Sequence, residues 1–286
     1  MPRKLPKVSI VLPTYNRAKL LHSALHSIVA QSFQDWELIV VDDCSKDDTQ
    51  KVVDSIHDPR ICYLRHKNNK GGSAARNTGI RKSVGEFVAF LDDDDLWEFC
   101  YLEEQLNAMA AYDAVTSGYR LSNETPRSSG SAVVPITSSM LRKGYAGCGT
   151  SGLMIRRPVI ESLMFDESLP SGQDWDLLMR LTQRYRVGFL PEPLVVYEQG
   201  THSRISNQIA NSPISVIEKH IQVFLKHKPQ LGTFWFNYHV ARLLLYGIKS
   251  RENRFEHFCY TIKRCGFVAV TAYFSGRLFK LWEMRV

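Results

Sequence analysis

Short apolar runs alternate with amphipathic stretches along the first hundred residues of the chain. The apolar runs lie at 7–12, 37–41, 61–65 and 87–91. Their length and their β-branched residues are typical of strands buried on both faces of a parallel sheet. The stretches with helical periodicity lie at 18–31, 45–57 and 73–84. Strands that alternate with helices over short connections predict a three-layer α/β unit.

The pattern becomes less regular after Trp97. The strands expected there lie at 114–121, 151–155, 187–190 and 194–197. The expected helices lie at 101–111, at 174–185 and throughout the chain after Pro213, with turn signals near 228–229, 250 and 266. This pattern predicts an α/β fold with a mixed, mainly parallel sheet, formed by residues 1–210. A C-terminal helical region at 211–286 is expected to follow it.

Composition places the chain among ordinary globular proteins, because 44% of its 286 residues are hydrophobic and 23% are charged. No uncharged apolar stretch reaches the roughly 18 residues of a spanning helix. The first apolar run is too short for the core of a signal peptide. The six cysteines are scattered without a CxxC pair, which favours reduced thiols in a cytoplasm.

Positive charge is concentrated in the last quarter of the chain. Residues 219–286 carry twelve Lys or Arg and three acids, a net charge of +9, whereas the whole chain carries +7. Aromatic residues are interleaved with these basic residues, which suits an anionic membrane interface. A helical bundle whose aromatics pack on the preceding α/β domain explains the same pattern. Nucleic acid is not expected as a partner, because no nucleic-acid motif accompanies the charge.

Four consecutive carboxylates, Asp92 to Asp95, follow the apolar run at 87–91. Like charges at the end of a buried strand repel one another, and a divalent cation such as Mg²⁺ or Mn²⁺ relieves the repulsion. Ligands of open α/β sheets bind at this end of the strands. The alternative is a solvated acidic turn that caps the next helix. The motifs GxGxxG and GxxxxGK[ST] are absent, which speaks against an NAD-type dinucleotide fold and a P-loop kinase.

Four segments in this order resemble the family 2 inverting glycosyltransferases, which have the GT-A fold. The segments are KVSIVLPTYNR, ELIVVDDCSKDDT, NKGGSAARNTGIRKSVGEFVAFLDDDDLW and SGQDWDLLMRL. The resemblance covers residues 6–206 and implies a nucleotide-sugar donor, most often a UDP-sugar, with Mn²⁺ or Mg²⁺ as cofactor.

The resemblance also implies roles for individual residues. The residues that it places around the nucleotide-sugar are Pro13, Thr14, Tyr15, Asp43, Arg76, Asp92 and Asp93. Asp43 corresponds to the carboxylate at the uracil edge, and Asp93 stands where the family often has serine. The residues that it places on the metal are Asp94, Asp95 and, in a polar loop, His202.

Asp174 corresponds to the family's catalytic base. The family usually has Glu-Asp here, whereas this chain has Gln173-Asp174, and the loss of the neighbouring acid removes a like charge that raises the pKa of the base. The alternative role for Asp174 is a helix cap. Asp176 is expected to project from another side of the helix, and its replacement is expected to cost much less turnover.

The resemblance implies an enzyme that transfers a sugar to a hydroxyl group of a glycan or lipid-linked acceptor in bacterial surface polysaccharide synthesis. We expect it in the cytoplasm, with its basic tail favouring the inner face of the cytoplasmic membrane. Two alternatives remain at this point: a sugar-nucleotide-binding or scaffold protein without turnover, and a nucleotidyltransferase.

Overall fold

The computed structural model describes residues 5–125, 132–144, 149–197, 209, 212–248 and 253–283, with side chains up to residue 276. The chain divides into two compact units. The first comprises residues 1–141, 145–167 and 177–200, and it contains the sheet. The second comprises residues 142–144, 168–176 and 201–286, and its described regular elements are helices.

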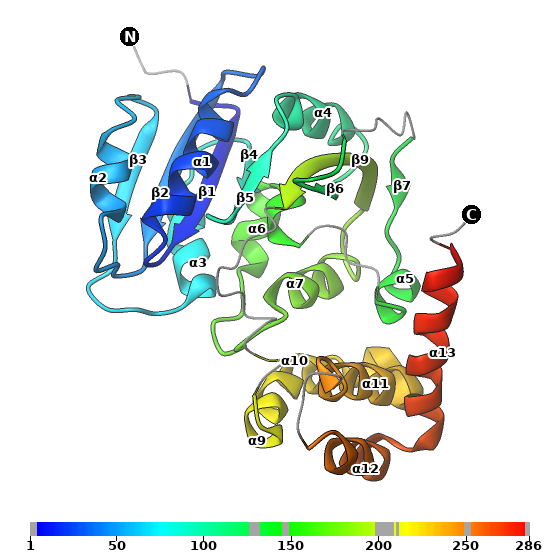
Figure 1. Ribbon diagram of the computed structural model, residues 1–286. Coiled ribbons are helices and arrows are strands. Elements are labelled where there is room, and N and C mark those ends of the chain that lie inside the picture. Colours follow the sequence, from blue (N-terminus) through cyan, green and yellow to red (C-terminus); the bar gives the residue numbers. More distant parts are fainter. Residues whose placement is uncertain are drawn as a thin grey trace. The chain divides into compact units, whose positions relative to one another are not determined.

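The described strands of the first unit form one nine-stranded mixed sheet (Figure 1). Its strands are β1 (Val8–Thr14), β2 (Trp36–Asp42), β3 (Ile61–Arg65), β4 (Phe87–Phe90), β5 (Asp95–Trp97), β6 (Ala114–Leu121), β7 (Val134–Pro135), β8 (Leu153–Arg156) and β9 (Val187–Tyr197). The order is β3-β2-β1-β4-β8-β6-β9-β5, with β7 also paired to β9. The first four strands in this order run parallel, β8 is antiparallel to both its neighbours, and β6 and β9 are parallel. The predicted α/β fold with a mainly parallel sheet is confirmed.

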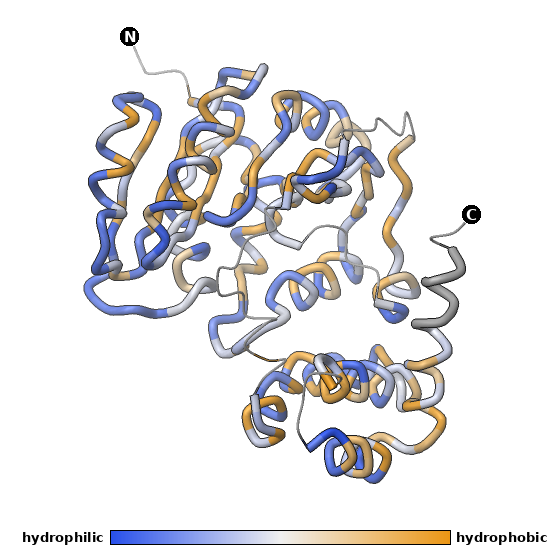
Figure 2. Tube along the Cα trace, viewed as in Figure 1, coloured by the Kyte–Doolittle hydropathy of each residue, from blue (hydrophilic) through white to orange (hydrophobic). Residues whose placement is uncertain are grey.

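Helices cover both faces of this sheet. Those that begin in the first unit are α1 (Ala18–Val29), α2 (Thr49–Asp54), α3 (Gly72–Lys82), α4 (Tyr101–Ala108), α5 (Ser138–Arg142) and α6 (Arg157–Leu163). Hydrophobic and hydrophilic residues alternate around α1 and α2, as expected of helices with one buried side (Figure 2).

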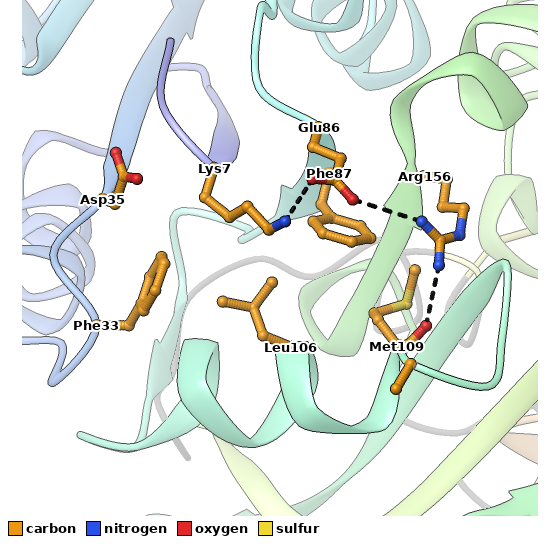
Figure 3. A pocket seen from close by; sticks show the side chains of 9 residues that line it. Lys7, Phe33, Asp35, Glu86, Phe87, Leu106, Met109 and Arg156 are labelled. Atoms are coloured by element: carbon orange, nitrogen blue, oxygen red, sulfur yellow. Dashed lines mark hydrogen bonds and ion pairs between the residues drawn. The ribbon is translucent and has the colours of Figure 1, made fainter. Parts of the chain in front are cut away.

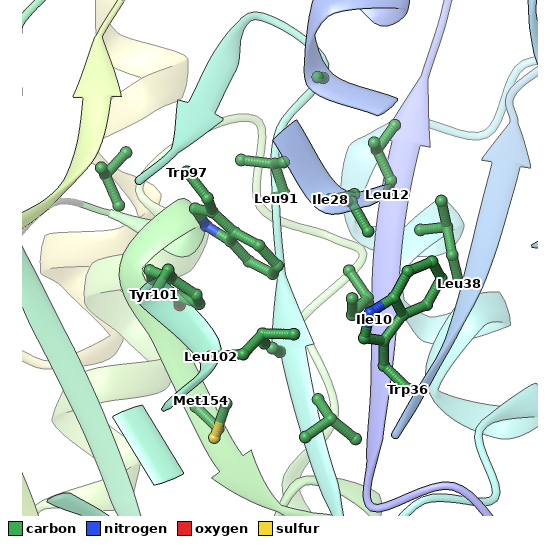
Figure 4. Close-up of a cluster of buried hydrophobic side chains, with 14 of the residues drawn as sticks. Ile10, Leu12, Ile28, Trp36, Leu38, Leu91, Trp97, Tyr101, Leu102 and Met154 are labelled. Atoms are coloured by element: carbon green, nitrogen blue, oxygen red, sulfur yellow. The ribbon is translucent and has the colours of Figure 1, made fainter. Parts of the chain in front are cut away.

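The main core lies between the sheet and the side chains of α1 and α4. Successive strand residues point to opposite faces, so Ile10 and Leu12 of β1 face this core together with Leu38 of β2 (Figure 4). Trp97 stacks on Tyr101, with ring centroids 3.9 Å apart. Leu91, directly before the acidic run, belongs to the same core, so packing fixes the chain on both sides of the run.

The other face of the sheet carries α3. Ile39 and Val41 of β2 form a smaller core with Ala75 of α3. A Cβ atom at Gly79 would lie 2.3 Å from a methyl group of Val11, so only glycine allows α3 to lie this close to β1. The close contact holds the helix that carries Arg76 against the strand that ends at Thr14.

Two differences from the predicted elements concern β9 and β5. The strands predicted at 187–190 and 194–197 are one strand, β9, which continues through Pro191 and Pro193. Its pairing with β6 shifts register on both sides of Gly118, and this irregularity accommodates the prolines. Residues Asp95–Trp97 form β5, antiparallel to β9, although the sequence pattern predicts no strand there.

The helices of the second unit are α9 (Ile214–Ile217), α10 (Gln222–Lys226), α11 (Lys228–Leu244), α12 (Arg254–Cys265) and α13 (Phe267–Glu283), with a 3₁₀ turn at Glu218–Ile221. Two predicted turns are confirmed, since α11 begins at Lys228 and α12 ends at Cys265, directly before Gly266, which has a φ of 84°. The turn expected near 250 lies outside the described residues. The helix α7 (Gln173–Leu181) begins in residues assigned to the second unit.

Candidate active site

The carboxyl ends of β1, β2 and β4 lie at the same edge of the sheet, because these strands are parallel neighbours. Thr14 ends β1, Asp43 follows β2, and the acidic run follows β4. The hydroxyl of Thr14 donates a hydrogen bond of 2.7 Å to Oδ2 of Asp93, across 79 residues of sequence. The fold thus brings predicted donor-site residues from distant segments together at one edge.

Arg17 holds the middle of the acidic run. One nitrogen of its guanidinium lies 2.9 Å from Oδ1 of Asp93 and 3.0 Å from Oδ2 of Asp94. Burial raises the pKa of Asp93 to about 6, although the charge of Arg17 and the hydrogen bond from Thr14 act in the opposite direction. Arg17 therefore supplies the positive charge that allows these two carboxylates to lie side by side.

Asp92 is bound from two other segments. It forms an ion pair with Arg76 of α3, and Oδ2 accepts a 2.9 Å hydrogen bond from the hydroxyl of Thr150. The side chain of Asp92 is 29% exposed, so solvent and ligands reach it. The two predicted donor-site residues, Arg76 and Asp92, are therefore direct neighbours.

Asp95 is turned into the fold. It is buried in β5, and its Oδ2 accepts a 2.6 Å hydrogen bond from the hydroxyl of Ser151. The same hydroxyl accepts a hydrogen bond from the backbone amide of Asp92 at 3.2 Å. Ser151 thereby fixes both ends of the acidic run, and the role of Asp95 as a metal ligand stays a prediction.

Asp43 organises the turn that leads into α3. Its carboxylate accepts hydrogen bonds from the backbone amides of Lys70 and Gly71 at 2.7–3.0 Å, and from Nδ1 of His66 at 2.7 Å. Its side chain is 4% exposed. The predicted contact of Asp43 with a uracil edge is not tested by these bonds, which show instead that the residue holds this turn in place.

The remaining predicted residues on β1 differ in exposure. Pro13 is buried and pairs with Val41 in the sheet, whereas Tyr15 is 43% exposed beyond the end of the strand. An exposed aromatic ring at this edge is free to stack on a planar base. His202 lies outside the described residues.

The acidic run suits a hard divalent cation that a substrate shares. Among the described residues, no group of three or more His, Cys, Asp or Glu side chains is arranged to hold a metal ion. Asp94 is 11% exposed and offers carboxylate oxygens. In nucleotide sites, one or two carboxylates bind Mg²⁺, and substrate phosphates and water complete the coordination of the ion. The residues present fit such an ion.

In the second unit, Asp174 lies in the first turn of α7 and is partly buried. A carboxylate at this position is stabilised in its ionised form by the helix dipole. The helix begins one residue earlier than expected, at Gln173, whose side-chain amide donates to the carbonyl of Leu169 at 2.9 Å.

Asp176 occupies a structural position in the same unit. Its side chain is fully buried, and Oδ1 lies 2.7 Å from both Nζ of Lys226 and Nε2 of His227. Because Asp176 is buried and paired with these two side chains, its removal is expected to destabilise the fold. That its replacement costs much less turnover than replacement of Asp174 stays a prediction.

A separate pocket lies at the opposite edge of the sheet, next to the amino ends of β1 and β4 (Figure 3). It has a volume of about 450 Å³. Glu86 pairs with both Lys7 and Arg156, whose cations lie 5.2 Å from the ring centroid of Phe87. Because its own charges are already paired and the acidic run is at the other edge, this pocket is no part of the candidate active site.

Arg17, His66, Thr150 and Ser151 belong to the site but have no role in the sequence-based prediction. Arg17 directly follows the segment PTYN, and its proximity to that segment is the signal that could have identified it. The other three are recognisable only in the folded chain, because they reach their partners across 23 to 59 residues.

Comparison with known proteins identifies the family of the sheet-bearing part. The model of the family described as "Glycosyl transferase family 2" matches residues 9–159, about half of the chain.

Two curated relatives are similar over different lengths. WcaA of Escherichia coli K12, a candidate colanic acid biosynthesis glycosyl transferase, is 27% identical over 86% of this chain and 90% of that protein. WfgD of Escherichia coli is 40% identical over 36% of this chain and 40% of that protein. It is named a UDP-Glc:α-D-GlcNAc-diphosphoundecaprenol β-1,3-glucosyltransferase.

Two solved structures share the fold. Staphylococcus aureus TarS 1–349 in complex with UDP-GlcNAc matches with a TM-score of 0.64 and 18% identity, over 94% of this chain and 92% of that chain. The mannosyltransferase PcManGT of Pyrobaculum calidifontis, in complex with GDP-Man and Mn²⁺, matches with a TM-score of 0.60 and 21% identity, over 98% of this chain and 82% of that chain.

Proposed function

The chain belongs to glycosyl transferase family 2, and from this we propose that it moves a sugar from a UDP-sugar to a hydroxyl group of a lipid-linked saccharide in the synthesis of a bacterial surface polysaccharide. The observation that carries the proposal is the edge where Thr14, Arg17 and the acidic run meet. Such an edge is where open α/β sheets bind nucleotides.

Named relatives support the proposed classes of donor and acceptor. WfgD takes its name from UDP-Glc and a diphosphoundecaprenol-linked acceptor, and TarS forms a complex with UDP-GlcNAc. We assign the nucleoside to Pro13, Thr14, Tyr15 and Asp43. The exposed ring of Tyr15 supports this assignment, since it is available to stack on the base.

The diphosphate is assigned to the acidic run through a divalent cation. When bound, Mn²⁺ or Mg²⁺ supplies a Lewis acid that neutralises the departing diphosphate. Asp94 is the proposed ligand, because it is partly exposed and Asp93 and Asp95 are more deeply buried. Asp92 and Arg76, which hold each other in place, border the donor sugar. The complex of PcManGT with Mn²⁺ supports the choice of ion.

The proposed reaction is a single displacement. The acceptor oxygen forms a bond to the anomeric carbon while the bond from that carbon to the phosphate oxygen breaks, and UDP leaves with the electron pair. Asp174 takes the proton of the acceptor hydroxyl as general base. Attack on the face opposite the leaving group inverts the anomeric configuration.

The proposed location is the cytoplasm, at the inner surface of the cytoplasmic membrane, where a lipid-linked acceptor is available. No helix among the described residues is long and apolar enough to cross a membrane. The +9 charge of residues 219–286 supports attachment to an anionic surface.

The test is a panel of UDP-sugars, each incubated with the purified protein, Mn²⁺ and a diphosphoundecaprenol-linked monosaccharide, with products identified by mass spectrometry. We expect one UDP-sugar to extend the lipid-linked acceptor by one residue and to release UDP. A protein that binds UDP but turns over no donor would be a sugar-nucleotide-binding protein instead, and release of diphosphate would indicate a nucleotidyltransferase.

A further inference from the structure

Helix α12 exposes its apolar residues. Phe255 is 79% exposed, and Cys259 and Ile262 follow it at the four- and seven-residue spacing of one helix face, with Cys259 exposed and Ile262 half-buried. The buried residues of the helix are His257, Thr261 and Cys265. An ordinary surface helix turns its apolar stripe inward, so the pattern of α12 is reversed.

The start of α13 extends the same apolar surface. Phe267 and Val268 are 66% and 67% exposed and directly follow Gly266, the turn between the two helices. Phe274, 38% exposed, contacts Phe258 of α12 with ring centroids 6.2 Å apart. We call the surface formed by Phe255, Phe258, Ile262, Phe267, Val268 and Phe274 the α12–α13 face.

Other residues of α12 and α13 attach these helices to the rest of the second unit. Ala269, Val270 and Tyr273 are buried and give the helix its own contact with the rest of the unit. Tyr260 and Arg264 of α12 both bind Oε1 of Glu218, at 2.6 and 3.5 Å. Both helices are thus anchored without their exposed aromatics, which are left for an external partner.

Exposed basic residues of α12 lie next to the α12–α13 face. Arg254 and Lys263 are exposed beside Phe255 and Ile262, and Glu256 is the acidic residue among the described positions 253–276. Large aromatics with adjacent cations suit the boundary between lipid headgroups and acyl chains. Near an anionic membrane each such cation is attracted by the negative surface potential of the lipid headgroups.

We propose that the α12–α13 face is the surface that docks on an anionic lipid bilayer. The proposal rests on the proposed function, since a lipid-linked acceptor is presented at a bilayer. The alternative occupant, a second copy of the chain, is disfavoured by charge. A two-fold symmetric contact through this face brings Arg254 and Lys263 of both copies into one interface, where like charges repel.

The test compares two double substitutions by co-sedimentation with vesicles of phosphatidylglycerol and phosphatidylcholine. Phe255→Ser with Phe267→Ser removes the two most exposed aromatics of the face. Phe99→Ser with Tyr119→Ser is the matched control, because Phe99 and Tyr119 are 66% and 49% exposed aromatics of the first unit. We expect the first variant to bind at least about tenfold more weakly, since each lost phenylalanine removes a large apolar insertion. The control should bind like the parent.

Charge is tested separately. Lys263→Glu should weaken binding to the anionic vesicles, and added salt should weaken binding of the parent protein, because surface charges are screened. Vesicles of phosphatidylcholine alone should bind poorly. Equal vesicle binding by both double variants overturns the proposal. So does a parent protein that ignores the vesicles but forms a dimer, by light scattering, that the face variant loses.

Activity separates this proposal from the function itself. With a short-chain, water-soluble diphosphate-linked acceptor, the Phe255→Ser/Phe267→Ser variant should keep the parental rate, and with the vesicle-embedded acceptor it should lose most of it. If the parent transfers sugar to neither acceptor, the proposed function fails, whatever the sedimentation result. If the variant loses activity equally on both acceptors, the face has a role other than docking.

Discussion

We expect Arg17 to offset the repulsion between the carboxylates of the acidic run when no divalent cation is bound. Replacing it with methionine keeps much of the length of the side chain and removes the charge. Asp93 is 6% exposed and Asp94 is 11% exposed, and Arg17 lies within 3.0 Å of both. Without it, Asp93 keeps the hydrogen bond from Thr14 but loses its ion pair.

The expected cost follows from this geometry. Removing one partner of a buried ion pair costs about 3–5 kcal/mol, and the lower end applies here because Arg17 itself is 29% exposed. For chains of this size each kcal/mol lowers the melting temperature by roughly 2–4 °C, so we expect a fall of about 6–12 °C. Mn²⁺ with UDP should raise the melting temperature of the variant more than that of the parent, since the cation replaces part of the missing charge.

The assay is thermal unfolding of three proteins, with and without Mn²⁺ and UDP. The third protein is Arg81→Met, whose arginine is 61% exposed and lies 3.6 Å from Glu167, so its loss should cost at most about 1 kcal/mol. If Arg17→Met melts within the range of Arg81→Met, the acidic run does not depend on Arg17 and the reasoning is refuted. If Mn²⁺ and UDP raise the melting temperatures of both variants equally, the cation does not replace the charge of Arg17.

Four further outcomes are expected. Asp94→Asn should abolish transfer and weaken UDP binding in the presence of Mn²⁺, and chelation of the parent with EDTA should have the same effect. Asp174→Asn should fold and bind UDP normally, measured by calorimetry, but lose about 10²–10⁴-fold in initial rate. Asp176→Ala should lower the free energy of unfolding in urea by about 3–5 kcal/mol, because it strands Lys226 next to an empty buried site. Burial lowers the pKa of His239 from 6.5 to about 4. Between these pH values the unfolded chain binds a proton that the folded chain does not, so the protein becomes less stable as the pH decreases. We expect a loss of about 1.6 kcal/mol between pH 6.5 and 5, and His239→Gln should reduce it.

Local patterns were sufficient to predict the parallel half of the sheet. The strand at 61–65 has the predicted bounds, and β1, β2 and β4 differ from theirs by one or two residues. Each of these runs is apolar, short and bounded by turn residues, so the signal is contained within the segment itself. The parallel order of β1, β2 and β4 then places Thr14, Asp43 and the acidic run at one edge without further information.

The other half of the sheet depends on contacts that the sequence does not display. Residues 95–97 are too short and too acidic at their start to indicate a strand, and β5 exists because β9 pairs with it about 100 residues later. Proline at 191 and 193 suggested a break in β9. A Cβ at Gly118 would lie 2.8 Å from the carbonyl of Pro191, so a glycine on the neighbouring strand makes room for this irregular backbone.

The chemistry of the site divides in the same way. A run of four aspartates is visible in the sequence, but its partners are not, because Arg17, Thr150 and Ser151 come from separate segments. For Asp176, the sequence predicts the helical position but not the partners. Its helical position separates it from Asp174, yet only the folded chain reveals the buried pairing with Lys226 and His227.

The most direct test of the central claim is transfer of a labelled sugar from its UDP-sugar to a lipid-linked saccharide by the full-length protein, with the anomeric configuration of the product determined by NMR. The account predicts Mn²⁺- or Mg²⁺-dependent transfer with inversion, and loss of transfer without loss of UDP binding in Asp174→Asn. Transfer with retention of configuration, or full activity of Asp174→Asn, would contradict it.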